Sequence, residues 1–143
     1  MSEQYINEIF KLEFSTSKKM KIPVKLSQYT IGKLIIDYAK CVVVSSNHPT
    51  TKDKVAIKCI PIKYFEEDPQ ETEIMSQLTH PNIIRHIESF SYPLRNPRFF
   101  AIVMPRAVYD LLDYLNKFGP FSEKRVWKIM KQALEAIDYM HSI

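Results

Sequence analysis

A chain of 143 residues with 45% apolar content is long enough to bury one modest core, but too short for two full domains. Its 20 basic and 16 acidic residues give a scattered net charge of +4, which argues against nucleic-acid binding. The sequence has no signal-like amino terminus, no long apolar run and no cysteine or histidine pair at metal-ligand spacing. We therefore expect a reduced, cytoplasmic protein with no membrane span and no metal site.

The first segment, residues 1–26, mixes lysines with apolar side chains. It fits a short amphipathic helix with a basic linker, or a tail that becomes ordered on contact, and we favour the tail. β-Branched residues then dominate at 29–35 and 42–44, which predicts two strands joined by residues 36–41. A loop at 47–54 leads into a third strand, and an antiparallel arrangement is the simplest for all three.

The third predicted strand carries a lysine within an apolar run, Val55, Ala56, Ile57 and Lys58. Strand alternation places Ala56 and Lys58 on one face, and Val55 and Ile57 on the other. An ammonium group among such neighbours is poorly solvated, so it should have an anionic partner, either a carboxylate or a ligand phosphate. A small apolar side chain beside a cation suits a flat heterocycle followed by phosphates. The four residues alone fit an exposed strand face equally well.

A helix is predicted to begin after Asp68, with Pro69 at its first position and Glu71 three residues after the cap. Helical spacing places Glu71 on one face with three apolar residues, Ile74, Met75 and Leu78. We therefore expect the Glu71 carboxylate to point inward. The same carboxylate would also suit a capping box, and the two roles compete for it.

Two more strands are predicted at residues 83–90 and 98–104. Pro105 should end the second one, because proline has no N–H for a ladder hydrogen bond. Asp110 is then placed to cap a short helix at 111–118, which Gly119 closes.

A longer helix is predicted to begin after Ser122. It presents a broad apolar stripe made of Val126, Ile129, Met130, Ala133, Ile137 and Met140. An apolar arc of this width normally faces a core on more than one side. Few residues of the sequence remain to cover it.

The order of these elements and the motifs on them resemble the protein kinase fold. The motifs are V-A-I-K at 55–58, Glu71 placed nine residues before His80, H-P-N-I-I at 80–84 and A-I-D-Y-M-H-S at 136–142. The resemblance covers about residues 28–143, and it is closer to a serine/threonine kinase than to a tyrosine kinase.

The resemblance implies an α+β fold with three parts. Residues 1–26 form an amino-terminal extension. Residues 27–107 form a kinase-like small lobe and hinge, with a five-stranded antiparallel sheet and one helix. Residues 108–143 then supply the first two helices of an incomplete large lobe.

The resemblance also implies an ATP site. Lys58 would hold the α- and β-phosphates of ATP and pair with Glu71. Three side chains would line the adenine slot, with the last of them at its back: Val43, Ala56 and Met104.

The segment that follows the last predicted strand would bind adenine through backbone groups of Pro105 and Ala107. Proline is tolerable there because its position contributes a carbonyl rather than an N–H. Asp110 would lie near the ribose, although a cap without a ligand suits this residue at least as well.

The phosphate loop departs from the family pattern G-x-G-x-x-G-x-V. Ile36, Tyr38 and Cys41 occupy the three glycine positions, and only Val43 is retained. Glycine there permits positive φ and lets backbone N–H groups approach phosphate oxygens. Asp37 adds a negative charge beside them. We therefore expect Tyr38 or Ile36 to fold into the cleft, and ATP to bind weakly or not at all.

The sequence stops at Ile143, before any H-R-D catalytic loop, D-F-G metal ligand or A-P-E segment. Residues 1–143 alone are therefore expected to be inactive as a kinase. Three interpretations stay open: a protein kinase or pseudokinase that lacks its remaining lobe, a complete small interaction module, or a nucleotide binder without transfer chemistry. In the first two, the missing lobe or a protein partner would cover the face formed by Val126, Met130, Ala133 and Ile137.

Overall fold

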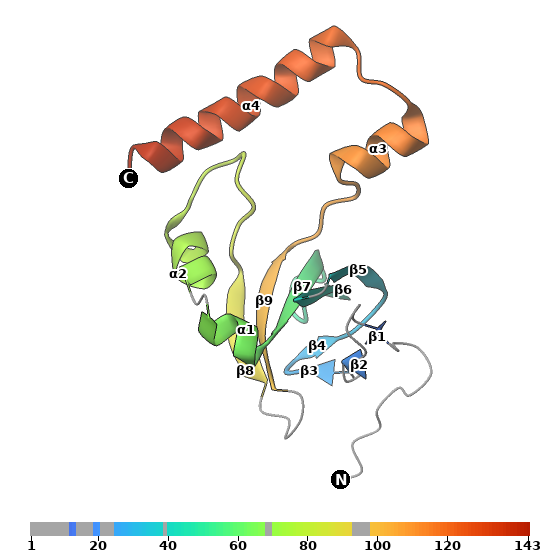
Figure 1. The fold of residues 1–143 in the computed structure, drawn as a ribbon, viewed down its shortest axis with the longest axis vertical. Coiled ribbons are helices and arrows are strands. Elements are labelled where there is room, and N and C mark those ends of the chain that lie inside the picture. Colours follow the sequence, from blue (N-terminus) through green and yellow to red (C-terminus); the bar gives the residue numbers. More distant parts are fainter. Residues whose placement is uncertain (1–11, 14–18, 21–24, 39, 68–69, 93–97) are drawn as a thin grey trace.

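The computed structural model describes residues 12–13, 19–20, 25–38, 40–67, 70–92 and 98–143. A β-sheet with two small helices forms one part, and a single segment leads from it to a pair of helices at the carboxyl end (Figure 1). Most of the expected extension at 1–26 lies outside the described residues. The predicted helix start at Asp68 and Pro69 also lies outside them.

The predicted sheet of five antiparallel strands is confirmed. Its strands lie in the order β5-β6-β7-β9-β8, and every neighbouring pair is antiparallel. Their bounds are Leu34–Tyr38 (β5), Cys41–Asn47 (β6), Lys54–Pro61 (β7), Glu88–Tyr92 (β8) and Phe99–Pro105 (β9). Two short antiparallel pairs precede the sheet: Leu12–Glu13 (β1) with Lys19–Met20 (β2), and Lys25–Leu26 (β3) with Tyr29–Thr30 (β4).

One face of the sheet is the core of the described structure. The alternation predicted for β7 is confirmed, because Val55, Ile57 and Cys59 all belong to this core. Apolar residues of the neighbouring strands complete the cluster: Val42, Val44, Phe99, Ala101 and Val103. Lys58 therefore lies on the opposite face of the sheet, and it is only half-buried there.

The hairpin β3–β4, which precedes the sheet in the chain, packs against this core. Leu26 and Tyr29 are fully buried in it, and the Tyr29 ring stacks on Phe90 with ring centroids 6.3 Å apart. The Tyr29 hydroxyl donates a hydrogen bond to Glu88. Burial, together with this carboxylate, raises the pKa of the Tyr29 phenol far above its ordinary value. The structure therefore places Leu26, the last residue of the expected extension, inside the sheet's core.

The strand predicted at 29–35 is interrupted, because Gly32 lies against Ser45 of β6. The Gly32 N–H donates to the Ser45 carbonyl at 2.7 Å, and a Cβ at this position would lie 2.6 Å from Ser45 Oγ. The same Oγ accepts the Lys33 N–H at 2.6 Å. The close approach of the two backbones requires a glycine at this position, which lies between β4 and β5.

The strand predicted at 83–90 is wrong over its first half. Ile83 donates its N–H to the His80 carbonyl at 3.1 Å in a turn, and β8 begins only at Glu88. A run of β-branched residues suggested extended structure, but a local turn and contacts with a distant helix determine the path of the chain here.

Four helices are described, and their bounds are Ile62–Glu67 (α1), Gln70–Gln77 (α2), Leu111–Phe118 (α3) and Glu123–His141 (α4). α1 was not predicted. Asp110 caps α3 by accepting the Asp113 N–H at 2.7 Å, and Gly119 ends it with φ 82°. Ser122 caps α4 as predicted. In the described parts of the chain, no helix is both long and apolar enough to cross a membrane.

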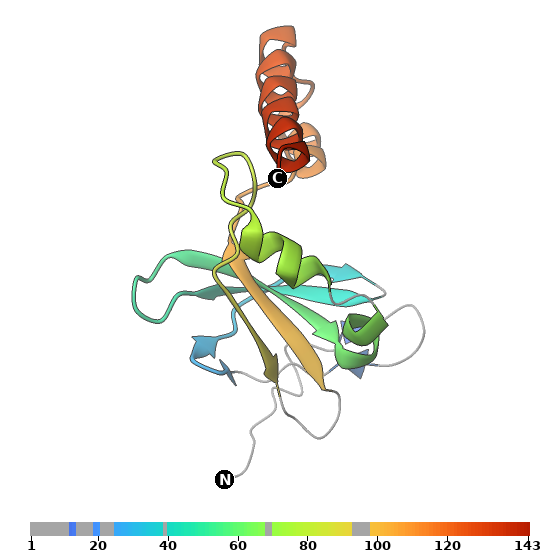
Figure 2. The ribbon, with the colours of Figure 1, turned by 90° about the vertical axis from the view of Figure 1, so that its left-hand side faces the viewer.

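The loop between α2 and β8 rises toward α4 and contacts it (Figures 1 and 2). The Thr79 N–H donates to the Tyr139 hydroxyl at 3.0 Å, and the His80 ring stacks on the Tyr139 ring at 5.1 Å. The Asn82 amide donates to the Gln132 carbonyl at 3.2 Å and to Glu135 at 3.1 Å. One side of α4 is therefore attached to the part of the structure that contains the sheet.

Leu26 offers a test of the amino-terminal hairpin. Leu26→Ala should lower the free energy of unfolding by about 2–5 kcal/mol, because it removes a fully buried side chain and leaves a cavity. Lys25→Ala, at the exposed neighbouring position of the same strand, should change it by less than about 0.5 kcal/mol. Urea unfolding followed by circular dichroism measures both. Equal, small effects would show that the hairpin does not belong to the core.

Candidate functional site

Lys58 and Glu71 form an ion pair that joins strand β7 to helix α2. The Lys58 Nζ lies 2.6 Å from Glu71 Oε1 and 2.7 Å from Oε2. The two side chains are 24% and 39% exposed, so the pair stands at the edge of solvent. The anionic partner expected for Lys58 is therefore a carboxylate, and Glu71 points inward as expected.

The three side chains expected around adenine lie on the same face of the sheet as Lys58. Strand register pairs Val43 directly with Lys58, and Ala56 directly with Met104. Ala56 is buried, whereas Val43 and Met104 are half-buried. The sheet thus brings a small apolar patch and a cation together, which is the chemistry that a flat heterocycle with an anionic tail requires. Binding of ATP by these residues stays a prediction.

Pro105 is the last residue of β9 and pairs with Val55. The strand therefore ends where it was predicted to end, and the Arg106 N–H donates to the Lys54 carbonyl at 3.1 Å. Ala107 follows in the exposed segment that leads to α3.

Asp110 serves as the cap of α3, which was the alternative to its place near a ribose. Its carboxylate is exposed and accepts the Asp113 N–H. The cap needs only part of a carboxylate's hydrogen-bonding capacity. A ribose contact by Asp110 therefore stays a prediction.

The segment expected to replace the phosphate loop is a tight hairpin. β5 continues to Tyr38, and Tyr38 pairs with Cys41, so only residues 39 and 40 lie between the strands. Ile36 pairs with Val43, which in turn pairs with Lys58. A half-buried isoleucine side chain therefore shares the face of Lys58, where the family pattern has its first glycine.

Of the two side chains expected in the cleft, Ile36 is half-buried on the face of Lys58. Tyr38 lies at the end of its strand beside the turn and is 60% exposed. The expected place of the Asp37 charge is wrong. Asp37 pairs with Val42, a core residue, and strand alternation therefore places it on the face opposite Lys58. Its charge does not lie on the ligand face.

Cys41 occupies the third glycine position and carries a free thiol. Burial raises the pKa of this thiol, Lys58 lowers it, and the carboxylates of Glu71 and Asp37 raise it. The net direction is upward, so the thiol stays neutral at physiological pH. Among the described residues, no cluster of three His, Cys, Asp or Glu side chains is placed to hold a metal ion.

The structure also forms a hollow that sequence reasoning missed. It has a volume of about 440 Å³ and lies between α3, α4 and the segment after β9, away from Lys58. Its lining residues all lie between positions 108 and 132, but together they form no recognisable motif. The two features that could have indicated it are the aromatic residues of α3 and the dense basic residues of α4.

A double-mutant cycle on Lys58→Met and Glu71→Gln tests the ion pair. Because both side chains are partly exposed, the coupling free energy should be about 0–1 kcal/mol, measured by chemical unfolding of the four proteins. The exposed pair Lys131–Glu135, at 3.9 Å in α4, serves as a control and should give about 0.3–0.5 kcal/mol. A coupling of several kcal/mol would instead identify a desolvated pair.

Comparison with known proteins supports the resemblance to the protein kinase fold. Residues 37–143 match the family model of the protein kinase domain. A probable myosin light chain kinase of Dictyostelium discoideum is 32% identical over 118 residues, which cover 79% of this chain and 29% of that protein. Calcium-dependent protein kinase 5 of Plasmodium berghei is 36% identical over 121 residues, which cover 82% of this chain and 20% of the relative.

The fold is also found among solved structures. A crystal structure of Rad53 1–466 in complex with AMP-PNP matches with a TM-score of 0.69 and 26% sequence identity, over 80% of this chain and 30% of that one. The chain thus spans less than a third of each of these three proteins. The sheet order, the Lys58–Glu71 pair and the family match agree, and the chain belongs to the protein kinase family.

Proposed function

We propose that residues 1–143 form the degenerate nucleotide-binding part of a serine/threonine-type kinase domain, which binds ATP weakly and transfers no phosphoryl group by itself. The observation that carries this proposal is the Lys58–Glu71 pair at 2.6 Å, on the same sheet face as Val43, Ala56 and Met104. Cys41 and Cys59 carry free thiols, which fit a reducing compartment, and we therefore propose that the protein is cytoplasmic.

The adenine side of the proposed site is well supported. Ala56 presents a small apolar surface, Met104 lies opposite it across the strand pair, and Val43 lies beside Lys58. An adenine ring placed against these side chains would direct its phosphates toward Lys58, whose ammonium group can contact a phosphate while it remains bound to Glu71.

The hairpin offers few groups that could bind the phosphates of ATP, and we therefore propose that ATP binds weakly. Ile36 and Tyr38 have side chains where a phosphate-binding hairpin has glycines, and strand pairing up to Cys41 already engages the hairpin backbone. Backbone N–H groups used in a ladder are not available to cradle phosphate oxygens. Lys58 would then be the main attraction for the triphosphate.

Phosphoryl transfer needs a positioned base and carboxylates that hold magnesium. Residues 1–143 contain no H-R-D, D-F-G or A-P-E triplet. The proposal for these residues is therefore nucleotide binding without the groups that position magnesium and the nucleophile. Activity of the whole protein as a transferase is a separate proposal, because the chain spans only part of its kinase relatives.

Restoring glycine to the hairpin tests this proposal. The triple variant Ile36→Gly, Tyr38→Gly and Cys41→Gly should bind ATP about tenfold more tightly than the unchanged chain, because backbone groups gain access to the phosphates. Adenosine should bind both proteins equally, since the adenine patch is unchanged. Titration calorimetry with ATP, with and without magnesium, measures these affinities.

Two controls make the result interpretable. Lys58→Ala in the triple variant should remove the gain for ATP but leave adenosine binding unchanged. Circular dichroism shows whether the hairpin tolerates the three glycines. Tight binding of MgATP by the unchanged chain would contradict the proposal, and so would transfer of labelled phosphate to a protein substrate.

A second candidate function is docking through α4, and the exposure of its apolar stripe favours it. Val126, Met130, Ala133 and Ile137 are all exposed, and they lie on one face of the helix. A contiguous apolar surface of this kind normally meets another surface. Either the remaining kinase lobe or a protein partner would fit it.

Sedimentation velocity tests this second candidate. The unchanged chain should self-associate in a concentration-dependent manner, because its apolar stripe is uncovered. Met130→Lys with Ile137→Lys should yield a monomer of 16.8 kDa. Asp138→Lys, which adds the same net charge at an exposed position beside the stripe, should leave the association unchanged. A chain that is monomeric at every concentration would contradict docking through this face.

A further inference from the structure

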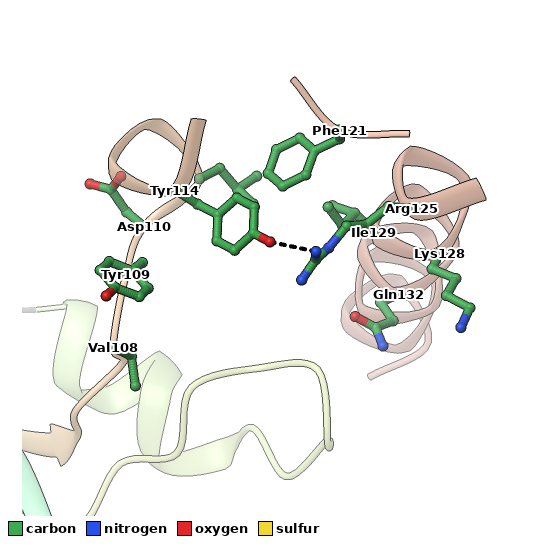
Figure 3. Close-up of a pocket in the computed structure, with 10 residues that line it drawn as sticks. Val108, Tyr109, Asp110, Tyr114, Phe121, Arg125, Lys128, Ile129 and Gln132 are labelled. Carbon is green, nitrogen blue, oxygen red and sulfur yellow. Dashed lines mark hydrogen bonds between the residues drawn. The ribbon is translucent and has the colours of Figure 1, made fainter. Parts of the chain in front are cut away.

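The hollow between α3 and α4 combines an apolar wall with unpaired cations (Figure 3). Val108 and Leu111 supply exposed aliphatic side chains on one side, and Val108 is 83% exposed. Ile129 lines the opposite side from α4. A volume of about 440 Å³ is within the range of ligand pockets and would admit one or two side chains of a partner.

Arg125 and Lys128 give the hollow its positive charge. Both line it from α4, and within the described residues neither has a carboxylate at ion-pair distance. The first turns of this helix are basic as a whole, with Lys124, Arg125, Lys128 and Lys131 against a single acidic residue, Glu123. The carboxylate of Asp110 also lies in the lining, but it caps α3.

Aromatic side chains hold Arg125 in a fixed orientation. Its guanidinium donates to the Tyr114 hydroxyl and lies 4.5 Å from the centre of the Tyr114 ring. Tyr114 in turn stacks on Phe121 with centroids 5.0 Å apart. The hydroxyl occupies one of the five guanidinium N–H groups, so most donors stay free for a carboxylate. An arginine held by stacking also loses less rotamer freedom when it binds an anion.

This hollow adjoins the apolar stripe of α4, and Ile129 belongs to both. Arg125, Ile129 and Gln132 continue along the helix toward Ala136 and Tyr139, at the three- and four-residue spacing of a single face. That face contacts the loop between α2 and β8 through Gln132 and Tyr139. Val126 and Met130 of the stripe lie on the neighbouring face of the helix.

We propose that this hollow is a docking site for an acidic peptide segment that carries an aliphatic anchor. The anchor would lie against Val108 and Leu111, and carboxylates beside it would bind Arg125 and Lys128. Charge complementarity selects the partner's chemistry, because a basic or neutral segment would leave both cations desolvated without a counter-charge. The site does not involve Lys58, but it shares Asp110, the expected ribose contact, with the proposed nucleotide site.

The test uses the 143-residue chain and a fluorescein-labelled peptide in which glutamates flank a central pair of leucines. Fluorescence anisotropy should show saturable binding that weakens as salt is added. Arg125→Glu with Lys128→Glu should weaken binding by at least about tenfold, and Lys128→Glu alone should weaken it measurably. Lys124→Glu with Lys131→Glu makes the same change of charge outside the lining and should have a much smaller effect.

A second pair of variants separates the anchor from the charge. Leu111→Ser should weaken binding, whereas Leu112→Ser, at an exposed neighbouring position outside the lining, should not. Circular dichroism confirms that each variant is folded. Three outcomes would overturn the proposal: no saturable binding, equal losses for the two charge-reversal pairs, or equal binding of a peptide in which serines replace the leucines.

Discussion

The Lys58–Glu71 ion pair is the described contact that most directly ties helix α2 to the sheet. α2 has no buried side chain, and its apolar residue Ile74 is exposed. A partly exposed ion pair contributes about 0–1 kcal/mol, whereas full burial of one leucine contributes about 1.5–3 kcal/mol. The helix is therefore held by a weak, charge-dependent contact. An anion that binds Lys58 would contact an ammonium group that already pairs with Glu71.

The sheet is held in a different way, because its core lies on the face away from Lys58. The stability of β7 comes from Val55, Ile57 and Cys59, which pack in the core on the face away from Lys58. The side chain of Ile36 lies on the other face. An isoleucine in place of glycine at position 36 adds a side chain at a half-exposed surface and favours strand pairing. The fold therefore tolerates this residue.

Local rules predicted the parts of the site that depend on one element at a time. Alternation along β7 placed Lys58 and Ala56 on one face, and helical spacing placed Glu71 inward. The errors arise where residues distant in sequence decide the outcome. Ser45 contacts Gly32 where the strand was expected to continue, and Asn82 bonds to Gln132 and Glu135 of α4 where another strand was expected. Neither contact can be seen in a pattern of neighbouring residues.

The hollow beside α4 escaped prediction because it depends on the angle between two helices, which brings Val108, Tyr114 and Arg125 together. Periodicity alone presents α4 as one apolar stripe opposite a solvated basic face. In the structure, the basic side is divided, because Lys124 and Lys131 lie outside the lining of the hollow, whereas Arg125 and Lys128 face it.

The two sides of α4 therefore suit partners that associate by different physics. An apolar stripe gains free energy in proportion to the area that it buries, so its occupant must be large and closely packed. A small basic hollow gains from a few desolvated charge contacts, which steer association and are sensitive to salt. The two surfaces meet at Ile129, which belongs to the stripe and also lines the hollow, so their occupants would lie next to each other.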